Sequence, residues 1–156
     1  MTKFSPDREL TLTRWIDAPR GAVYRCWTEA ALLKQWFVPQ PWTVPEAEVD
    51  VRPGGTSRIL MRGPDGTENL TIGVYLEVVP DERLVFTDAF DAAWAPKSGQ
   101  PFMLGIITLS DENGGTRYTA QVRHWTVEAT QQHAAMGFDA GWGQCADQLA
   151  ALARTL

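Results

Sequence analysis

The sequence predicts an α+β fold in which a curved antiparallel sheet of six to seven strands wraps around a long C-terminal helix. Two patterns predict it. Apolar and polar residues alternate through most of residues 45–125, as in strands with one buried face, and apolar residues recur every three or four positions from residue 138 onward, as on one side of a helix. No linker or internal repeat divides the 156 residues, so we expect residues 1–156 to form one domain.

The first forty residues are predicted to contain one strand and two short helices. Residues 9–16 are rich in leucine and β-branched residues over a typical strand length. Residues 17–19 end in a proline that suits the first turn of a helix, and we expect this helix to extend to about Trp27. A second short helix follows and ends before Pro39, because proline cannot continue it.

The middle of the chain is predicted to be a meander of antiparallel strands. Turns rich in glycine, proline and aspartate separate the alternating segments, and such turns reverse the chain between adjacent strands. The predicted strands after the first are residues 45–52, 57–62, 72–78, 84–87, 102–109 and 116–125. Residues 89–101 have no regular period and include Trp94, so we interpret them as an irregular loop and a candidate lid.

The last part of the chain is predicted to be one helix of about 28 residues, which at 1.5 Å per residue is ~40 Å long. Thr126 is a suitable N-cap, because its hydroxyl can accept a hydrogen bond from a backbone N–H group in the first turn. The apolar stripe of this helix consists of Phe138, Trp142, Cys145, Leu149, Leu152 and Leu156. Gly137, Gly141 and Gly143 each weaken a helix by ~1 kcal/mol relative to alanine, so they indicate close backbone packing or a bend.

These elements imply a cavity between the helix and the sheet. A helix is about 10 Å wide and cannot cover a face of six or seven strands, so the sheet must curl and leave space at its open end. The two short helices and the candidate lid are the available walls of this space. The predicted ligand-binding residues are the bulky side chains expected to face it, namely Trp36, Phe37, Ile59, Met61, Phe86, Trp94, Tyr118, Val122, His124, Met136, Phe138 and Trp142.

Charge and composition argue against several kinds of partner. The net charge is −5 and the 14 lysine and arginine residues are scattered, so we expect no nucleic-acid partner. No segment approaches the ~18 consecutive apolar residues of a membrane span, and the first residues lack the apolar region of a signal peptide. Cys26 and Cys145 match neither a CxxC motif nor a disulfide framework, which favours a reducing compartment. We therefore expect a cytoplasmic protein without membrane contact.

We expect no metal ion and no cofactor. The histidines His124 and His133 and the cysteines Cys26 and Cys145 lack the short spacing of zinc ligands. The glycine-serine motif of hydrolase nucleophiles and the glycine-rich motifs that bind phosphates or dinucleotides are also absent from the sequence.

Acid–base chemistry in an apolar cavity is the one catalytic option left. His124 is the best candidate for it. Alternate residues of a strand share one face, so His124 is expected on the same face as Tyr118 and Val122. His133, near the start of the predicted helix, is more typical of a solvated or capping side chain, and Asp88, at a strand end, of a turn acid. A structural role is also the more common one for a histidine placed like His124.

Several segments in a fixed order carry a resemblance to a known family. They are residues 10–19, 23–39, 50–55, 61–66, 73–75, 80–84 and 141–142. In this order they resemble the START-like (SRPBCC) superfamily and, more narrowly, proteins related to the C-terminal domain of the heat-shock-protein-90 ATPase activator. The resemblance implies the helix-grip fold, with a ligand cavity between helix and sheet. It implies no single function, because the superfamily includes hydrophobic-ligand carriers, polyketide cyclases and toxin-resistance proteins.

Three hypotheses of function follow. The first, which we favour, is a non-enzymatic protein that binds a small hydrophobic or aromatic ligand in the cavity. The second is an enzyme of the cyclase or hydrolase kind with His124 as general base. The third is a module that contacts a chaperone, and it rests on the resemblance alone. The sequence carries no signal for the oligomeric state.

Overall fold

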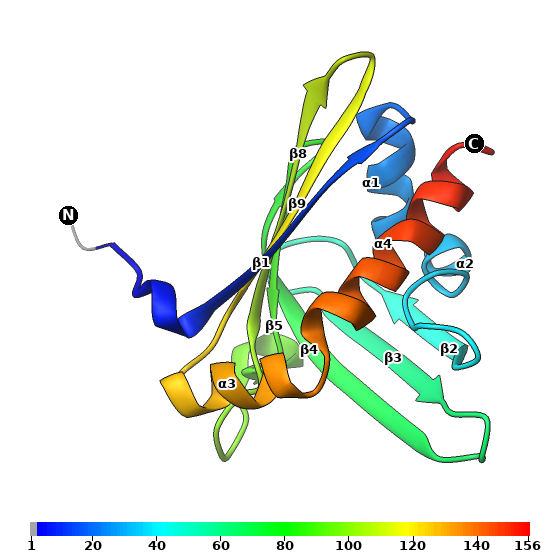
Figure 1. Cartoon of the computed structure of the whole chain (residues 1–156). Helices are drawn as coiled ribbons and strands as arrows, with labels where there is room; N and C mark the ends of the chain where they lie inside the picture. The colour runs from blue at the N-terminus through cyan, green and yellow to red at the C-terminus, as the bar shows by residue number, and fades with distance from the viewer. Residues whose placement is uncertain (1–2) are drawn as a thin grey trace.

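The structure, a computed structural model, describes residues 3–156 and combines a large sheet with helices on one side of it (Figure 1). The strands of the large sheet are β1 (Glu9–Ile16), β2 (Thr43–Val49), β3 (Thr56–Arg62), β4 (Glu68–Val79), β5 (Arg83–Thr87), β8 (Leu104–Glu112) and β9 (Gly115–Arg123). The α-helices are α1 (Arg20–Thr28), α2 (Ala30–Leu33), α3 (Val127–Ala135) and α4 (Phe138–Ala153). Short 3-10 helices cover Pro6–Arg8 and Ala92–Trp94.

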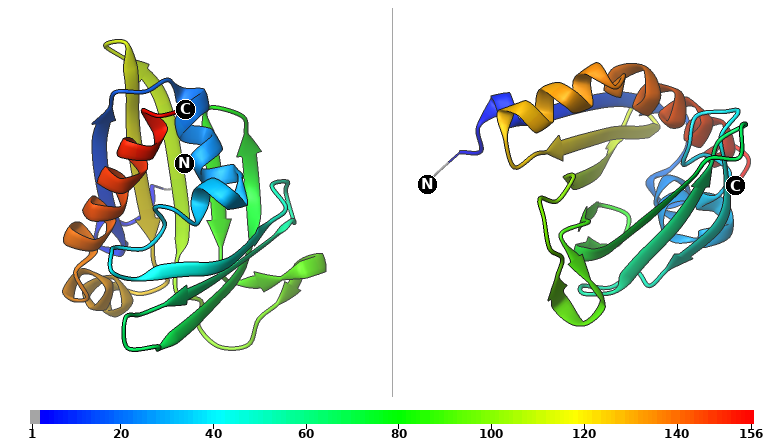
Figure 2. Two further views of the ribbon diagram at one scale, coloured as in Figure 1. Left: turned by 90° about the vertical axis from the view of Figure 1, so that its right-hand side faces the viewer. Right: turned by 90° about the horizontal axis from the view of Figure 1, so that it is seen from below.

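The seven strands form one antiparallel sheet in the order β1-β9-β8-β5-β4-β3-β2. The two edge strands, β1 and β2, are consecutive in the sequence, so α1 and α2 must lead the chain from one edge of the sheet to the other. They do so on the same side of the sheet as α4, and α1 contacts α4, β8 and β9 (Figure 2, left). The predicted α+β class, with a curved antiparallel sheet around a C-terminal helix, is confirmed.

The sheet bends so strongly that its two halves face different directions. Strands β1, β9 and β8 lie behind α3 and α4, whereas β2, β3 and β4 turn forward and pass below α4 (Figure 1; Figure 2, right). A wide sheet with a single buried face must curl in this way when few helices cover it. We call the side that faces α1 and α4 the inner face.

The predicted single C-terminal helix is interrupted. Thr126 caps α3 as expected, since its hydroxyl accepts a 3.0 Å hydrogen bond from the Ala129 N–H. Helix α3 then ends at Ala135, with Met136 as its C-cap, and Gly137 takes a left-handed conformation with φ of 95° before α4 begins. Residues with a β-carbon rarely adopt this conformation, so the glycine marks the bend.

The predicted apolar stripe is correct for α4 but not beyond it. Phe138 and Leu149 are buried, and Trp142, Cys145 and Leu152 are half-buried against the core. Leu156 does not pack on the sheet, because α4 ends at Ala153 and the Leu156 side chain is 43% exposed.

The loop at residues 89–101 is more ordered than predicted. It forms a small two-stranded ribbon of β6 (Phe90–Asp91) and β7 (Ala95–Pro96). Trp94 at its tip packs edge-on against Phe90, with 5.8 Å between ring centroids, and lies over Gly54 in the β2–β3 turn. The loop therefore leans on a hairpin turn through Trp94.

Candidate functional site

One row of residues crosses the inner face from edge strand β1 to β4. It consists of Leu10, Val122, Gly105, Phe86 and Tyr75, each paired with the next in the sheet register. Directly paired residues of antiparallel strands point to the same side, so all five share the inner face. Val122 and Tyr75 are buried, whereas Leu10 and Phe86 are only half-buried, so the helices cover this row incompletely.

Gly105 leaves space that the ring of Phe86 fills. A β-carbon at position 105 would lie 2.5 Å from the Phe86 ring, which is closer than any van der Waals contact. The far end of the Phe86 ring therefore lies directly over Gly105 in β8. A larger residue at this position would push Phe86 away from the sheet.

On the α1 side of this row, four aromatic rings form the tryptophan cluster, defined as Trp27, Trp36, Phe37 and Phe86. The centroid of Trp27 lies 4.8 Å from that of Trp36, 6.0 Å from that of Phe37 and 5.5 Å from that of Phe86. The Trp36 indole donates a 2.9 Å hydrogen bond to the carbonyl of Cys26. Trp27 and Trp36 are buried, so this end of the inner face is closed.

On the α3 side, a second group forms the histidine cluster, defined as His124, His133, Phe102, Phe138 and Trp142. His133 from α3 lies at its centre, with its ring centroid 4.7 Å from Phe102, 5.3 Å from Phe138 and 6.4 Å from Trp142. Phe102 is 45% exposed and Trp142 is half-buried. This cluster is therefore apolar in its walls and partly open to solvent.

The two histidines of the cluster are hydrogen-bonded to each other. The Nε2 atom of His124 lies 2.9 Å from Nδ1 of His133, and the two side chains belong to residues that are 1% and 6% exposed. The prediction that His133 is a solvated or capping side chain is therefore wrong. Helix α3 turns the His133 side chain inward, toward His124, which lies on the same face of the sheet as Val122.

Burial keeps His133 uncharged near neutral pH. Desolvation, with a smaller effect from the charge of His124, lowers the pKa of His133 from 6.5 to about 4. An imidazole with such a pKa is neutral at pH 7 and offers one N–H donor and one lone pair.

Asp88 holds the chain segment that covers the histidine cluster. Its carboxylate accepts hydrogen bonds of 2.9 Å from the Phe102 N–H and 3.1 Å from the Met103 N–H. The Thr87 hydroxyl donates a 2.9 Å bond to the Met103 carbonyl. Asp88 therefore positions Phe102 and Met103, which the sequence did not identify as site residues. It is the turn acid that the sequence favoured.

Met103 connects the two clusters on the inner face. It lies two residues before Gly105, directly before β8, and continuing the β8–β9 register beyond Leu104 places it opposite His124. Its side chain is half-buried. The half-buried residues Phe86, Met103 and Trp142 therefore lead from the tryptophan cluster to the histidine cluster.

The structure places the twelve predicted ligand-binding residues in different surroundings. Those on or over the inner face and buried are Trp36, Ile59, Tyr118, Val122, His124 and Phe138, and those half-buried there are Phe37, Met61, Phe86 and Trp142. The two that lie outside this group are Trp94, 49% exposed on its loop, and Met136, 72% exposed at the end of α3. Met136 points away because the helix turns at Gly137, one residue later.

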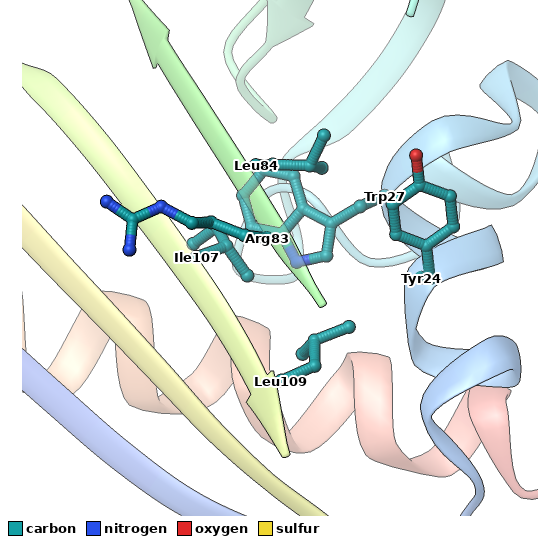
Figure 3. A pocket seen from close by; sticks show the side chains of 6 residues that line it. All are labelled: Tyr24, Trp27, Arg83, Leu84, Ile107 and Leu109. Atoms are coloured by element: carbon teal, nitrogen blue, oxygen red, sulfur yellow. The ribbon is translucent and has the colours of Figure 1, made fainter. Parts of the chain in front are cut away.

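An enclosed space between α1 and the sheet is too small for a ligand. It is lined by Tyr24, Trp27, Arg83, Leu84, Ile107 and Leu109 (Figure 3). It leaves no room for a water molecule. The Trp27 Nε1 atom is buried here and, within residues 3–156, has no hydrogen-bond partner. A second hollow lies on the surface among charged residues of β4, β5 and β8. Neither is the ligand-sized cavity expected under the helix.

Two further properties concern the described part of the chain as a whole. Between residues 3 and 156, no three histidine, cysteine or acidic side chains are grouped closely enough to hold a metal ion. In the same part of the chain, no helix is long and apolar enough to cross a membrane.

The bent seven-stranded sheet closed by α1 and α4 is the helix-grip architecture of the START-like superfamily. Within this class, the family model for "Activator of Hsp90 ATPase homolog 1-like protein" matches residues 17–154, and the chain belongs to that family. The resemblance noted in the sequence is thereby confirmed.

Solved structures of similar proteins share the whole fold. Protein NE0264 from Nitrosomonas europaea is 37% identical with a TM-score of 0.93, and the match covers 97% of each chain. Protein Ms6760 from Mycobacterium smegmatis is 26% identical with a TM-score of 0.79, over 94% of this chain and 90% of that one. A Staphylococcus epidermidis protein is 26% identical with a TM-score of 0.80, over 99% and 94%. No curated protein matches.

Proposed function

We propose that this protein binds a small hydrophobic or aromatic molecule between α4 and the inner face, at the open side of the histidine cluster. The observation that carries the proposal is that Phe86, Met103 and Trp142 are only half-buried along the inner face, next to the buried pair His124 and His133. Half-buried apolar side chains around a polar pair are typical of ligand sites, which combine apolar walls with a few polar groups.

Neither of the two hollows described above lies at this place, so we expect entry of the ligand to require a side chain to move. Phe102 is the side chain best suited to do so, since it is 45% exposed and belongs to the segment before β8. Its backbone stays anchored, because Asp88 binds the N–H groups of Phe102 and Met103. Rotation of one exposed ring is far less costly than separation of α4 from the sheet.

Burial of apolar surface supplies the affinity. A two-ring aromatic ligand that buries ~200 Å² gains about 5 kcal/mol from this burial. The loss of translational and rotational freedom offsets part of the gain, so we expect micromolar to millimolar dissociation constants for simple aromatic probes.

Thermal unfolding in the presence of an aromatic compound library tests the proposal. A ligand at a hundredfold excess over its dissociation constant adds ~2.7 kcal/mol to the free energy of unfolding, which gives a clear shift in Tm. The decisive comparison is Trp142→Ala, which should lose most of the shift, with Trp15→Ala, which should keep it. Trp15 is an exposed tryptophan whose indole bonds the Glu112 carbonyl in the last hairpin.

Absence of stabilisation by any compound of the library would contradict the proposal. So would a shift that Trp15→Ala removes and Trp142→Ala leaves intact, because the compound would then bind outside the inner face.

A further inference from the structure

The hydrogen bonds of His124 determine which of its ring nitrogens carries a hydrogen. Its backbone N–H donates a 2.8 Å bond to the carbonyl oxygen of Arg8, and its Nδ1 atom lies 3.2 Å from the same oxygen. A carbonyl oxygen has two lone pairs and only accepts, so Nδ1 must be the protonated nitrogen. In the neutral ring the Nε2 atom of His124 is then a bare acceptor.

The position of the hydrogen on the His133 ring follows from its position on His124. Its Nδ1 atom lies 2.9 Å from the Nε2 atom of His124, and two lone pairs at this distance would repel. Nδ1 of His133 therefore carries the hydrogen and donates it. The Nε2 atom of His133 is left as an acceptor at the end of a chain that runs from Arg8 through both histidines.

Burial of both rings favours the uncharged pair. The His124 residue is 1% exposed, so a charge there would lose almost all its hydration. The guanidinium of Arg8, which donates a 3.0 Å bond to the His124 carbonyl, adds a positive charge close by. Both effects favour the neutral pair.

The free acceptor of His133 is accessible. No residue in the described part of the chain bonds its Nε2 atom, and Trp27 Nε1 is the one side-chain atom there that is both fully buried and without a partner. Nε2 of His133 therefore reaches solvent over a small area, since the residue as a whole is only 6% exposed. It does so among the rings of Phe102, Phe138 and Trp142, which surround the imidazole.

We infer that the ligand of this site is an aromatic or conjugated molecule with a neutral hydroxyl group, of the phenol or enol class, which donates a hydrogen bond to Nε2 of His133. The inference rests on the proposed function and specifies it. An acceptor without a charge selects against carboxylates, whose oxygens are acceptors as well, and gains nothing from ethers, which have no hydrogen to donate. His133 is thus the residue that determines specificity.

Three probes that share one ring system test this inference by calorimetry at pH 7. They are 2-naphthol, which can donate, 2-methoxynaphthalene, which cannot, and 2-naphthoate, which carries a negative charge. We expect 2-naphthol to bind about 3- to 10-fold more tightly than the ether, the range of one neutral hydrogen bond, and 2-naphthoate to bind most weakly.

The variant His133→Asn tests the Nε2 acceptor separately from the hydrogen bond between the two histidines. Its amide nitrogen can still donate to His124, but nothing replaces the Nε2 acceptor, so the preference for 2-naphthol over the ether should disappear. Long-range ¹H–¹⁵N NMR spectra of the wild-type protein give an independent test, because they report the hydrogen on Nδ1 of both histidines without any substitution.

The outcomes separate this inference from the proposed function. Equal binding of 2-naphthol and its ether, or a hydrogen on Nε2 of His133, would overturn the inference and leave an apolar binding site in place. Tightest binding of 2-naphthoate would also overturn it, since the pair would then carry a proton. If none of the three probes binds, the proposed function fails for aromatic ligands and the inference fails with it.

Discussion

At the scale of single residues, the histidine pair is the feature that distinguishes this site from an ordinary apolar core. Two imidazoles share one hydrogen bond of 2.9 Å, and a backbone carbonyl determines its direction. Their packing against aromatic rings makes the charged form of His133 unfavourable. This leads to a prediction about stability as a function of pH.

Stability should fall as the pH decreases from 6.5 toward 4. The pKa of His133 is about 4 in the folded protein and near 6.5 in the unfolded chain, so in this window the unfolded chain binds more protons and acid favours unfolding. One pKa unit corresponds to about 1.4 kcal/mol, so His133 should account for a loss of ~2–3 kcal/mol. Urea denaturation at pH 7 and pH 4 measures it.

The variant His133→Phe is the control for this measurement, because it keeps a ring in place and cannot titrate. The free energy of unfolding should decline less between pH 7 and pH 4 in the variant than in the wild type. An equal decline in both proteins would show that other groups cause the acid sensitivity.

A second prediction at this scale concerns Asp88. The change Asp88→Asn removes the charge from an acceptor that binds the N–H groups of Phe102 and Met103. Hydrogen bonds to charged groups contribute about 1.5–3 kcal/mol, so we expect a loss of ~1–2 kcal/mol in the free energy of unfolding. Amide exchange should speed up at Phe102 and Met103. Unchanged exchange at both amides would contradict the role of Asp88 as their anchor.

At the scale of elements, the bend between α3 and α4 explains why the histidine pair was not predictable. The apolar stripe of α4, extended backward as one continuous helix, passes through positions 134, 135 and 131 and leaves His133 on the solvent side. With the chain turned at Gly137, helix α3 buries a different pair three residues apart, Thr130 and His133. The glycine was visible in the sequence, but the angle at which α3 meets β9 depends on packing far from it.

Two glycine substitutions test the bend directly. Gly137→Ala forces a β-carbon into a left-handed conformation with φ of 95° and should destabilise the protein by ~1 kcal/mol or more. Gly141→Ala, one turn later, places the β-carbon in open space inside α4 and should stabilise it by up to ~1 kcal/mol. If Gly137→Ala is as stabilising as Gly141→Ala, the two helices are continuous in solution.

The strands, in contrast, were largely predictable, because the alternation of apolar and polar residues identifies the buried face of a strand even when its neighbouring strands are unknown. Residues such as Tyr118, Val122 and His124 share the inner face as their parity indicated. Parity could not show that Trp94 leans on Gly54 or that Phe102 covers His133. Both contacts join loop residues to elements distant in the sequence.

At the scale of the whole molecule, the fold places one closed and one open end on the same inner face. The tryptophan cluster closes the α1 end with buried rings, whereas the histidine cluster leaves Phe102 and Trp142 partly exposed at the α3 end. The central claim is that a small aromatic ligand binds at the open end, beneath the start of α4.

The indole N–H signals of the seven tryptophans test this claim most directly, because a single ¹H–¹⁵N NMR titration compares Trp142 at the proposed site with tryptophans elsewhere in the molecule. With 2-naphthol as the probe, the signal of Trp142 should shift in a saturable manner, while those of Trp15 and Trp94, which are exposed away from the inner face, should stay in place. A saturable shift of the Trp15 or Trp94 signal, with that of Trp142 unchanged, would place the ligand elsewhere and contradict the account.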